Sequence, residues 1–289
     1  MTTEEMRVVR TREATKSAYQ ALPDGTARAA VLTMGALHDG HAALIRSARS
    51  AVGEDGHVTV TIFVNPLQFL AGEDLGRYPR TSKADIDVCA QEGADLVLVP
   101  PVGVVYRDGE PSVTVDPGPL GTLLEGAMRP GHFRGMLTVV HKLLGITGAD
   151  LTFFGEKDYQ QLVLVRRMVA DLDLPVRVVG VPTARDDDGL ALSTRNGYLT
   201  DEQRVHARVV PRAVIAGREA ARRGADATEV LAAARSELKG DDVVADYVVV
   251  TDPDLGPAPE SGPARLLVAV RVGDVRLLDN CALDLGSSA

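Results

Sequence analysis

Two histidines, His38 and His41, are the first residues whose type and spacing point to chemistry. They stand three positions apart in Thr-Met-Gly-Ala-Leu-His-Asp-Gly-His, residues 33–41. The apolar run 29–32 before them predicts a buried strand, and residues 42–48 after them predict a helix. The N-terminus of a helix attracts anions, and imidazoles placed there add hydrogen-bond donors. This pattern therefore favours a site for the phosphates of a nucleotide.

Other residues of the same turn have predicted roles. Gly35 and Gly40 are expected to let phosphates approach the backbone, because glycine has no side chain. Asp39 is expected to be the N-cap of the helix. The alternative is a purely structural turn, but two histidines in the pattern H-x-G-H directly after a strand favour the nucleotide site.

Apolar segments alternate with helical ones over the first 180 residues. Further strands are predicted at 57–64, 95–100, 150–154 and 176–181, and helices at 81–92, at 136–146 and up to about 172. The loop-rich stretch 101–133 is expected to contain a short strand at 112–115. Strands that alternate with helices predict an α/β fold with a Rossmann-like, doubly wound parallel sheet.

Polar residues follow the second of these strands. Asn65 and Gln68 lie where the strand ends, and the carboxyl edge of an open parallel sheet is where ligands bind. They are candidates for hydrogen bonds to a polar substrate, although Asn65 followed by proline is also a plain turn. For His132 and Arg134, at the start of a later helix, surface capping is favoured slightly over a substrate role.

A second pattern of strand, glycine and helix consists of the strand at 150–154, Gly155 and the helix that follows. Lys157 lies on the first turn of the helix, where a cation is unfavourable unless an anion is bound nearby. The neighbouring Glu156 and Asp158 offer a local explanation instead. We expect the two glycine-bearing turns to face one shared cavity.

The composition changes near residue 183. Residues 201–239 predict two helices joined around Gly224, and 246–250, 265–271 and 275–280 predict an antiparallel sheet. We therefore predict a nucleotide- and substrate-binding domain at 1–183 and a smaller α+β lid at 184–289, which would exclude water. Near the start of the lid, Ser193, Thr194 and Arg195 suit phosphate oxygens, although spacing alone favours a cap for the next helix.

Bulk properties exclude several classes of protein. The 289 residues carry a net charge of -9, whereas a nucleic-acid-binding surface is basic. The apolar runs are too short to span a membrane, and residues 1–5 do not resemble a signal peptide. The two cysteines, Cys89 and Cys281, are expected to be buried free thiols. Together these features predict a cytoplasmic protein.

Six blocks of sequence resemble the pantothenate synthetase (pantoate–β-alanine ligase) family, within the nucleotidyltransferase superfamily. Besides residues 33–41, the blocks are F-V-N-P-L-Q-F (63–69), Y-P-R-T (78–81), R-P-G-H-F-R-G (129–135), F-F-G-E-K-D-Y-Q-Q (153–161) and G-L-A-L-S-T-R-N (189–196). The resemblance covers almost the whole chain. It implies an ATP-dependent ligase in which pantoate and ATP form an acyl adenylate and pyrophosphate, and the amine of β-alanine then displaces AMP.

The resemblance also implies roles for particular residues. His41 would be the proton donor, and His38, Lys157, Ser193 and Arg195 would stabilise charge on the phosphates. Pantoate would be bound by Gln68 and Gln161, with Asn65 and Tyr78 near it. The implied ATP-binding residues are Met34, Gly35, Ala36, Leu37, His38, Asp39, Gly40, His41, Gly155, Glu156, Lys157, Asp158, Ala184, Leu192, Ser193, Thr194 and Arg195.

The family further implies Mg²⁺ and a homodimer. Asp85 falls in a helix where some members carry metal-associated acidic residues, but the neighbouring Ala84 has no carboxylate. We therefore expect Mg²⁺ mainly on the triphosphate, and any protein ligands for it stay unknown. The dimer contact could come from residues 58–63 or from the long loop. Two rival hypotheses are transfer of AMP or CMP to a phosphorylated acceptor, and nucleotide sensing without catalysis.

Overall fold

A computed structural model describes residues 6–70, 72–78, 81–107, 109–240 and 242–286 of the chain. The chain forms two compact units. The first contains Met1–Glu156 and Leu164–Val181, and the second contains Lys157–Val163 and Pro182–Ala289. Helix α7 (Tyr159–Asp171) therefore begins in the second unit and ends in the first. The substrate-binding role of residues 1–183 and the lid role of residues 184–289 stay predictions.

The first unit is built on one parallel sheet of six strands. In spatial order these are β1 (Arg7–Val9), β4 (Leu96–Leu98), β3 (His57–Ile62), β2 (Arg28–Thr33), β5 (Leu151–Gly155) and β6 (Arg177–Val181). This confirms the predicted doubly wound α/β fold. Strand β1 was not predicted, because it has only three residues and two of them are exposed.

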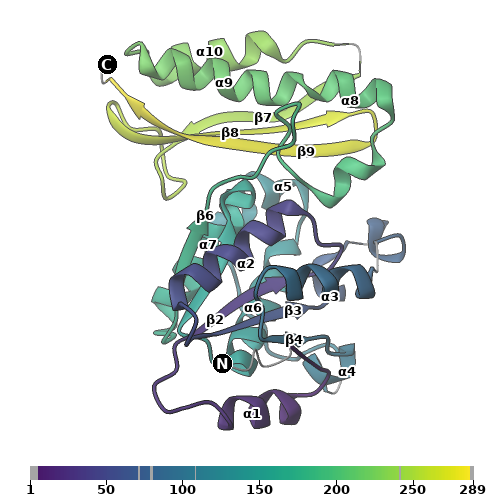
Figure 1. Cartoon of the computed structure of the whole chain (residues 1–289). Helices are drawn as coiled ribbons and strands as arrows, with labels where there is room; N and C mark the ends of the chain where they lie inside the picture. The colour runs from purple at the N-terminus through teal and green to yellow at the C-terminus, as the bar shows by residue number, and fades with distance from the viewer. Residues whose placement is uncertain (1–5, 71, 79–80, 108, 241, 287–289) are drawn as a thin grey trace. The chain divides into compact units, whose positions relative to one another are not determined.

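Helices cover both faces of this sheet. On one face, Ile45 of α2 (Asp39–Val52) and Cys89 of α3 (Ser82–Gln91) pack with Val31 and Val97; Figure 1 shows both helices in front of the strands. On the other face, α1 (Arg12–Gln20) and α6 (His132–Thr147) contribute Ala18 and Ile146 around Leu96 and Leu98. The alternation along β4 follows from the two-residue period of a strand.

Strands β2 and β5 define the point where the strand order reverses. From β2 the chain moves outward through β3 and β4, and it then returns to β5 on the other side of β2, where Val31 pairs with Phe153. In open parallel sheets, ligands bind beside the carboxyl ends of such strands. The turn that begins at Met34 leaves this edge of the sheet, and so does the chain that follows Gly155.

Two sequence predictions for the first unit need correction. Residues 112–115 form no strand; Val113 is 83% exposed, and the Val115 N–H donates to the Thr138 hydroxyl (3.0 Å) instead of to a neighbouring strand. The stretch 101–133 also contains α4 (Val102–Val105), the 3-10 turn η3 (Pro119–Thr122) and α5 (Glu125–Met128). Residues 58–63 cannot supply a dimer contact, because β3 is buried and paired with β2 and β4.

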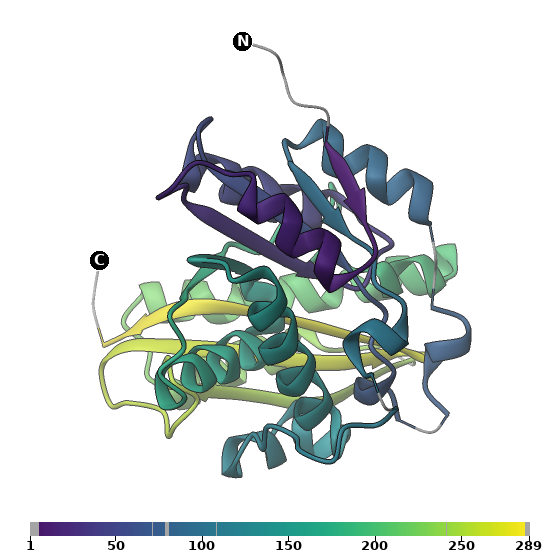
Figure 2. The same ribbon diagram turned by 90° about the horizontal axis from the view of Figure 1, so that it is seen from below.

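The second unit has a three-stranded antiparallel sheet, as predicted. Its strands are β7 (Val243–Thr251), β8 (Gly262–Val272) and β9 (Val275–Leu285), in the order β7-β8-β9. Helices α9 (Val209–Arg222) and α10 (Ala227–Glu237) pack on one face of it, and in Figure 2 these green helices lie behind the yellow strands.

The helical part of the second unit differs from the prediction of two helices. A third helix, α8 (Asp201–Ala207), precedes α9. The break at Arg208 has a simple cause: Pro211 has no N–H to donate to the carbonyl of Ala207, so one continuous helix would lack that hydrogen bond. The junction between α9 and α10 lies around Gly224, as predicted.

Candidate active site

The turn after β2 is held in place by a buried carboxylate. Asp85 of α3 is 2% exposed, and it accepts hydrogen bonds from the N–H groups of Ala36 (3.1 Å) and Leu37 (2.8 Å). The Thr81 hydroxyl donates to the same carboxylate (2.9 Å). Gly35 has a φ of +84°, and a Cβ there would lie 3.1 Å from the Asp85 carboxylate. The fold itself thus explains this glycine, because the backbone approaches Asp85 closely.

The two histidines cap the helix that follows. The N-cap is His38, whereas Asp39 is the first helical residue, so the prediction that Asp39 caps α2 is wrong. The His38 Nδ1 accepts a hydrogen bond from the N–H of Gly40 (3.1 Å), and the His41 Nδ1 accepts one from the N–H of His38 (3.3 Å). An imidazole fills the capping role here because its unprotonated nitrogen is an acceptor, like an aspartate oxygen.

This capping favours the same tautomer in both rings. Because each Nδ1 accepts from a backbone N–H, the neutral ring carries its proton on Nε2. The ring centroids of His38 and His41 lie 4.2 Å apart. Two neighbouring N–H donors on one turn are an arrangement that can stabilise charge on phosphate oxygens.

A network of amides orients Gln68 at the end of β3. Asn65 is fully buried, and its Nδ2 donates to the Gly135 carbonyl (3.1 Å) and to the Gln68 Oε1 (3.0 Å). The Asn65 Oδ1 accepts from the N–H of Leu67 (3.2 Å) and from the Tyr106 hydroxyl (2.8 Å). All four hydrogen-bonding positions of the Asn65 amide are therefore filled. This arrangement favours a positioning role for Asn65 over direct contact with a substrate.

The orientation of Asn65 determines what Gln68 can bind. Since the Gln68 Oε1 already accepts from Asn65, the Gln68 amide nitrogen is the group left to meet a ligand. That nitrogen donates to the Met34 sulfur (3.1 Å), which is a weak acceptor. A carboxylate or hydroxyl oxygen would be a stronger acceptor. The predicted substrate role of Gln68 is thus most consistent with an acceptor oxygen on the substrate.

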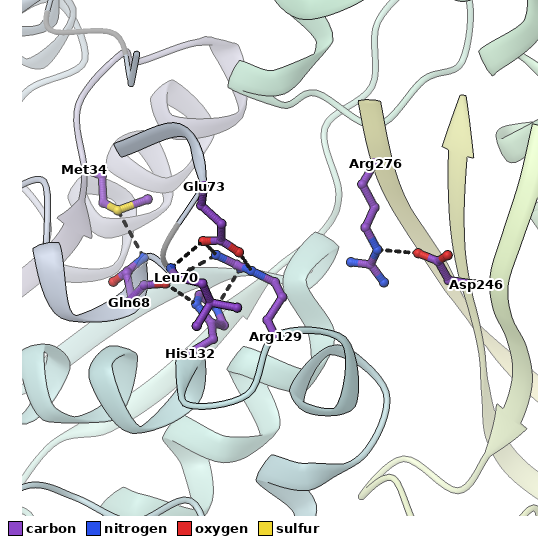
Figure 3. A network of polar contacts seen from close by, with 8 residues as sticks. All are labelled: Met34, Gln68, Leu70, Glu73, Arg129, His132, Asp246 and Arg276. Atoms are coloured by element: carbon purple, nitrogen blue, oxygen red, sulfur yellow. Dashed lines mark hydrogen bonds and ion pairs between the residues drawn. The ribbon is translucent and has the colours of Figure 1, made fainter. Parts of the chain in front are cut away.

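Helix α6 and the turn before it hold the Gln68 main chain. His132, Arg129 and Glu73 form this network, with Gln68 and Leu70 (Figure 3). The His132 Nδ1 donates to the Gln68 carbonyl (2.8 Å), and the Arg129 Nη1 donates to the His132 Nε2 (3.1 Å). Arg129 also donates one hydrogen bond to each carboxylate oxygen of Glu73 (2.7 Å each). His132 is 7% exposed, so surface capping is the wrong explanation for it. Arg134 is exposed and lies 3.7 Å from Asp116.

His132 predicts a particular pH dependence of stability. Burial, and then the nearby Arg129, lower the pKa of His132 to about 4 from 6.5. The folded state therefore binds this proton less tightly than the unfolded state, so stability contributed by His132 is present above pH 6.5 and is lost as the pH falls towards 4. The full effect is about 3 kcal/mol.

Urea unfolding of the wild type and of His132→Asn between about pH 7.5 and about pH 4.5 measures this effect. The stability advantage of the wild type should shrink steadily below pH 6.5. His141→Asn, which removes another imidazole from α6, is the matched control. A His132→Asn difference that does not change with pH would contradict the assignment.

Most of the remaining candidate residues belong to the second unit, whereas Gly155 and Glu156 belong to the first. Lys157 is the second residue after β5, and its Nζ lies 3.3 Å from the Asp158 carboxylate. Ser193 caps the 3-10 turn η5 (Thr194–Tyr198), and its Oγ accepts from the N–H of Arg195 (3.3 Å). Thr200 separately caps α8. Ser193 is therefore an N-cap, but of η5 and not of α8, the helix that the sequence spacing had favoured.

Some of the predicted site residues lie together in the first unit, and others lie together in the second. In the first unit, the segment 34–41 is linked to Gln68 through Met34, and Tyr78 packs edge-on against Phe69 with ring centroids 5.7 Å apart. Pro79 and Arg80, from the same sequence block as Tyr78, lie outside the described residues. Gln161, Ala184 and Leu192 belong to the second unit, where the Leu192 N–H donates to the Ala184 carbonyl (2.9 Å). Their proposed ligand contacts stay predictions.

Sequence reasoning missed the residues that position the site. The sequence suggests only a metal-binding role for Asp85, and it suggests no role for Tyr106, Arg129 or Glu73. The block R-P-G-H-F-R-G gives no local signal of its contacts with Glu73 and the Asn65 turn, because those contacts span 56 to 70 residues. Among the described residues, no group of three or more His, Cys, Asp or Glu side chains is arranged to hold a metal ion.

A doubly wound parallel sheet, with two histidine donors on the helix after its central strand, defines a protein of the α/β nucleotide-binding class. The chain belongs to the pantoate-beta-alanine ligase family, whose model matches residues 7–282. This confirms the family inferred from the six sequence blocks.

Individual relatives agree with this assignment. A pantothenate synthetase from Nocardioides sp. is 57% identical over 265 residues, which are 89% of this chain and 79% of the relative. The crystal structure of pantothenate synthetase from Thermus thermophilus is 45% identical, with a TM-score of 0.88 over 96% of this chain and 99% of that one. A pantoate-beta-alanine ligase from Francisella tularensis, complexed with beta-gamma ATP and β-alanine, is 33% identical, with a TM-score of 0.77 over 96% and 97% of the two chains.

Proposed function

We propose that this chain condenses pantoate with β-alanine in an ATP-dependent reaction, giving pantothenate, AMP and pyrophosphate through a pantoyl adenylate. Membership of the pantoate-beta-alanine ligase family supports the reaction. The structural observation that supports the reaction at this site is the pair of Nε2–H donors on His38 and His41 at the start of α2. A carboxylate is a poor acylating agent, and adenylation gives it a leaving group.

The residues divide into those for the phosphates and those for pantoate. His38 and His41 stabilise the charge that develops as pyrophosphate leaves, and His41 donates the proton. Lys157, Ser193 and Arg195 are proposed to add positive charge and hydroxyl donors. Gln68 presents its amide N–H groups to a pantoate oxygen, and the main chain of Gln68 is fixed by His132.

Mg²⁺ is proposed to enter on the phosphates of ATP. The Asp85 carboxylate is already bound to two backbone N–H groups and the Thr81 hydroxyl, so its donor set does not fit a direct metal ligand. Mg²⁺ usually keeps several waters and binds substrate phosphates, which requires few protein ligands. Its contribution is to neutralise phosphate charge.

The compartment and the assembly are also proposals. No helix in the described part of the chain is both long enough and apolar enough to cross a membrane. Cys89 and Cys281 are buried free thiols, and burial raises the pKa of Cys281 to about 11. Reduced cysteines fit the cytoplasm. A homodimer stays a prediction that sedimentation of the purified protein would test.

Isotope exchange between pyrophosphate and ATP tests the reaction. Label should enter ATP only when pantoate is present, and addition of β-alanine should give pantothenate. Exchange with a phosphorylated acceptor in place of pantoate would support a nucleotidyltransferase instead. ATP binding without exchange or amide formation would support a sensor.

Gln68→Ala should raise the KM for pantoate about 10- to 100-fold, because a hydrogen bond to a charged group contributes ~1.5–3 kcal/mol. The KM for ATP should change little. The measurement is the initial rate of exchange over a range of pantoate concentrations. Gln91→Ala removes an exposed glutamine from α3 and serves as the control. An unchanged KM for pantoate would remove Gln68 from the site.

A further inference from the structure

We propose that Asn280 and Arg265 are positioning residues for Lys157, acting on its main chain from the sheet of the second unit. The inference rests on the proposed function only where it concerns rate. Lys157 stands directly after β5 and Glu156 in the chain, yet it clusters with the second unit, together with the rest of Lys157–Val163. Contacts with Arg265 of β8 and Asn280 of β9 join this short segment to the sheet.

The attachment is made by the Asn280 amide. The Asn280 Nδ2 donates to the Lys157 carbonyl (2.8 Å), and the Asn280 Oδ1 accepts from the Arg265 Nε (2.9 Å) and also from its Nη2. Because an arginine can only donate, it fixes which end of the Asn280 amide faces Lys157. The amide can hold the Lys157 carbonyl only in this orientation.

Arg265 is itself held by the first residue of α7. Its guanidinium carbon lies 3.8 Å from the centre of the Tyr159 ring, and the Tyr159 hydroxyl donates to the Pro253 carbonyl (2.9 Å). A planar guanidinium stacked on an aromatic ring is a cation–π contact that lysine does not reproduce. Lys157 and Tyr159 thus both contact the same sheet: the Lys157 carbonyl accepts from Asn280, and the Tyr159 ring stacks against Arg265.

The burial of these polar groups argues against a purely structural role. Asn280 is 4% exposed and Arg265 is 6% exposed. They lie on the sheet face opposite α9 and α10, and Leu267 and Ala269 on that face are apolar and also buried. Apolar residues fill such positions at no loss of stability, and often with a gain, because a buried charge must be desolvated. A need to hold the Lys157 carbonyl in one place would explain why a guanidinium and an amide are buried here.

Asn280→Asp separates this role from folding. The carboxylate still accepts from Arg265, but it has no N–H for the Lys157 carbonyl. We expect pantoate-dependent exchange to fall about 10-fold with the KM for pantoate unchanged, and we expect Arg265→Lys to act in the same direction. In a Lys157→Ala background, Asn280→Asp should lower the remaining rate less than about 2-fold, because the position of an absent ammonium no longer matters.

A second measurement does not depend on catalysis. Backbone hydrogen exchange of the peptide that covers Lys157–Val163 should be faster in Asn280→Asp, with other peptides unchanged. The control is Asp246→Asn in the same sheet, where a carboxylate 2% exposed pairs with Arg276 (2.6 Å, Figure 3) and Arg271 (3.0 Å). That variant should lower the Tm but leave both the exchange of Lys157–Val163 and the rate within about 2-fold of wild type.

These experiments distinguish failure of the positioning role from failure of the proposed function. If Asn280→Asp lowers the rate equally in the wild-type and Lys157→Ala backgrounds, or leaves the hydrogen exchange of Lys157–Val163 unchanged, the positioning role is overturned. A wild type without pantoate-dependent exchange would overturn the proposed function, and the hydrogen-exchange result would still decide whether Asn280 holds Lys157.

Discussion

Replacement of His41 by asparagine is expected to lower the rate of pyrophosphate exchange about 10²- to 10³-fold, the usual effect of removing one preorganised donor. The His41 Nδ1 accepts from the N–H of His38, and an asparagine Oδ1 can occupy the same place. The capping box of α2 is then kept while the Nε2–H is lost. The Tm should therefore stay within about 2 °C of the wild type.

His41→Ala is the companion variant. It removes both the donor and half of the capping box, so the same loss of rate should come with about 1 kcal/mol of lost stability. His141→Ala, in α6, controls for the loss of an imidazole. Exchange kinetics and thermal unfolding measure the two effects separately. A His41→Asn enzyme with wild-type rate would show that the imidazole is needed only as a cap.

Asp85→Asn is expected to produce the largest loss of stability among the site variants. The Ala36 and Leu37 N–H groups each donate to a different oxygen of Asp85, so an amide must leave one of them facing an NH₂ group. An unsatisfied buried donor costs about 1–3 kcal/mol, which lowers the Tm of a chain of this size by a few degrees. The exchange rate should also fall about 10-fold or more, because the turn that carries His38 shifts.

The same variant tests the metal hypothesis for Asp85. If Asp85 only anchors the turn, the Mg²⁺ concentration for half-maximal rate should stay unchanged, and the Tm should fall without any ligand present. A direct metal ligand would give the opposite pattern, with a raised Mg²⁺ requirement and an unchanged Tm. Asp87→Asn is the control on the same helix, because Asp87 is exposed and its surface ion pair with Lys83 (2.8 Å) contributes little.

Local patterns accounted for much of the fold. Strands β2 to β6 follow from apolar runs of strand length, and α2 and α3 follow from helical periodicity between them. Prediction from the sequence failed for short segments whose conformation depends on contacts with another part of the chain. Strand β1 exists because it pairs with β4, and residues 112–115 form no strand because Val113 lies exposed to solvent and Val115 bonds to a side chain of α6.

The candidate site divides in the same way. Residue types and spacing alone predicted a doubly wound α/β protein and placed His38 and His41 on the turn that we propose binds the nucleotide, because a strand, a glycine turn and a helix are local features. Only the tertiary structure decided that Asp85 anchors that turn, that Asn65 and His132 orient Gln68, and that Asn280 holds Lys157. The physical reason is distance along the chain: most of these hydrogen bonds join elements that only folding brings together, and no pattern within one element encodes its partner.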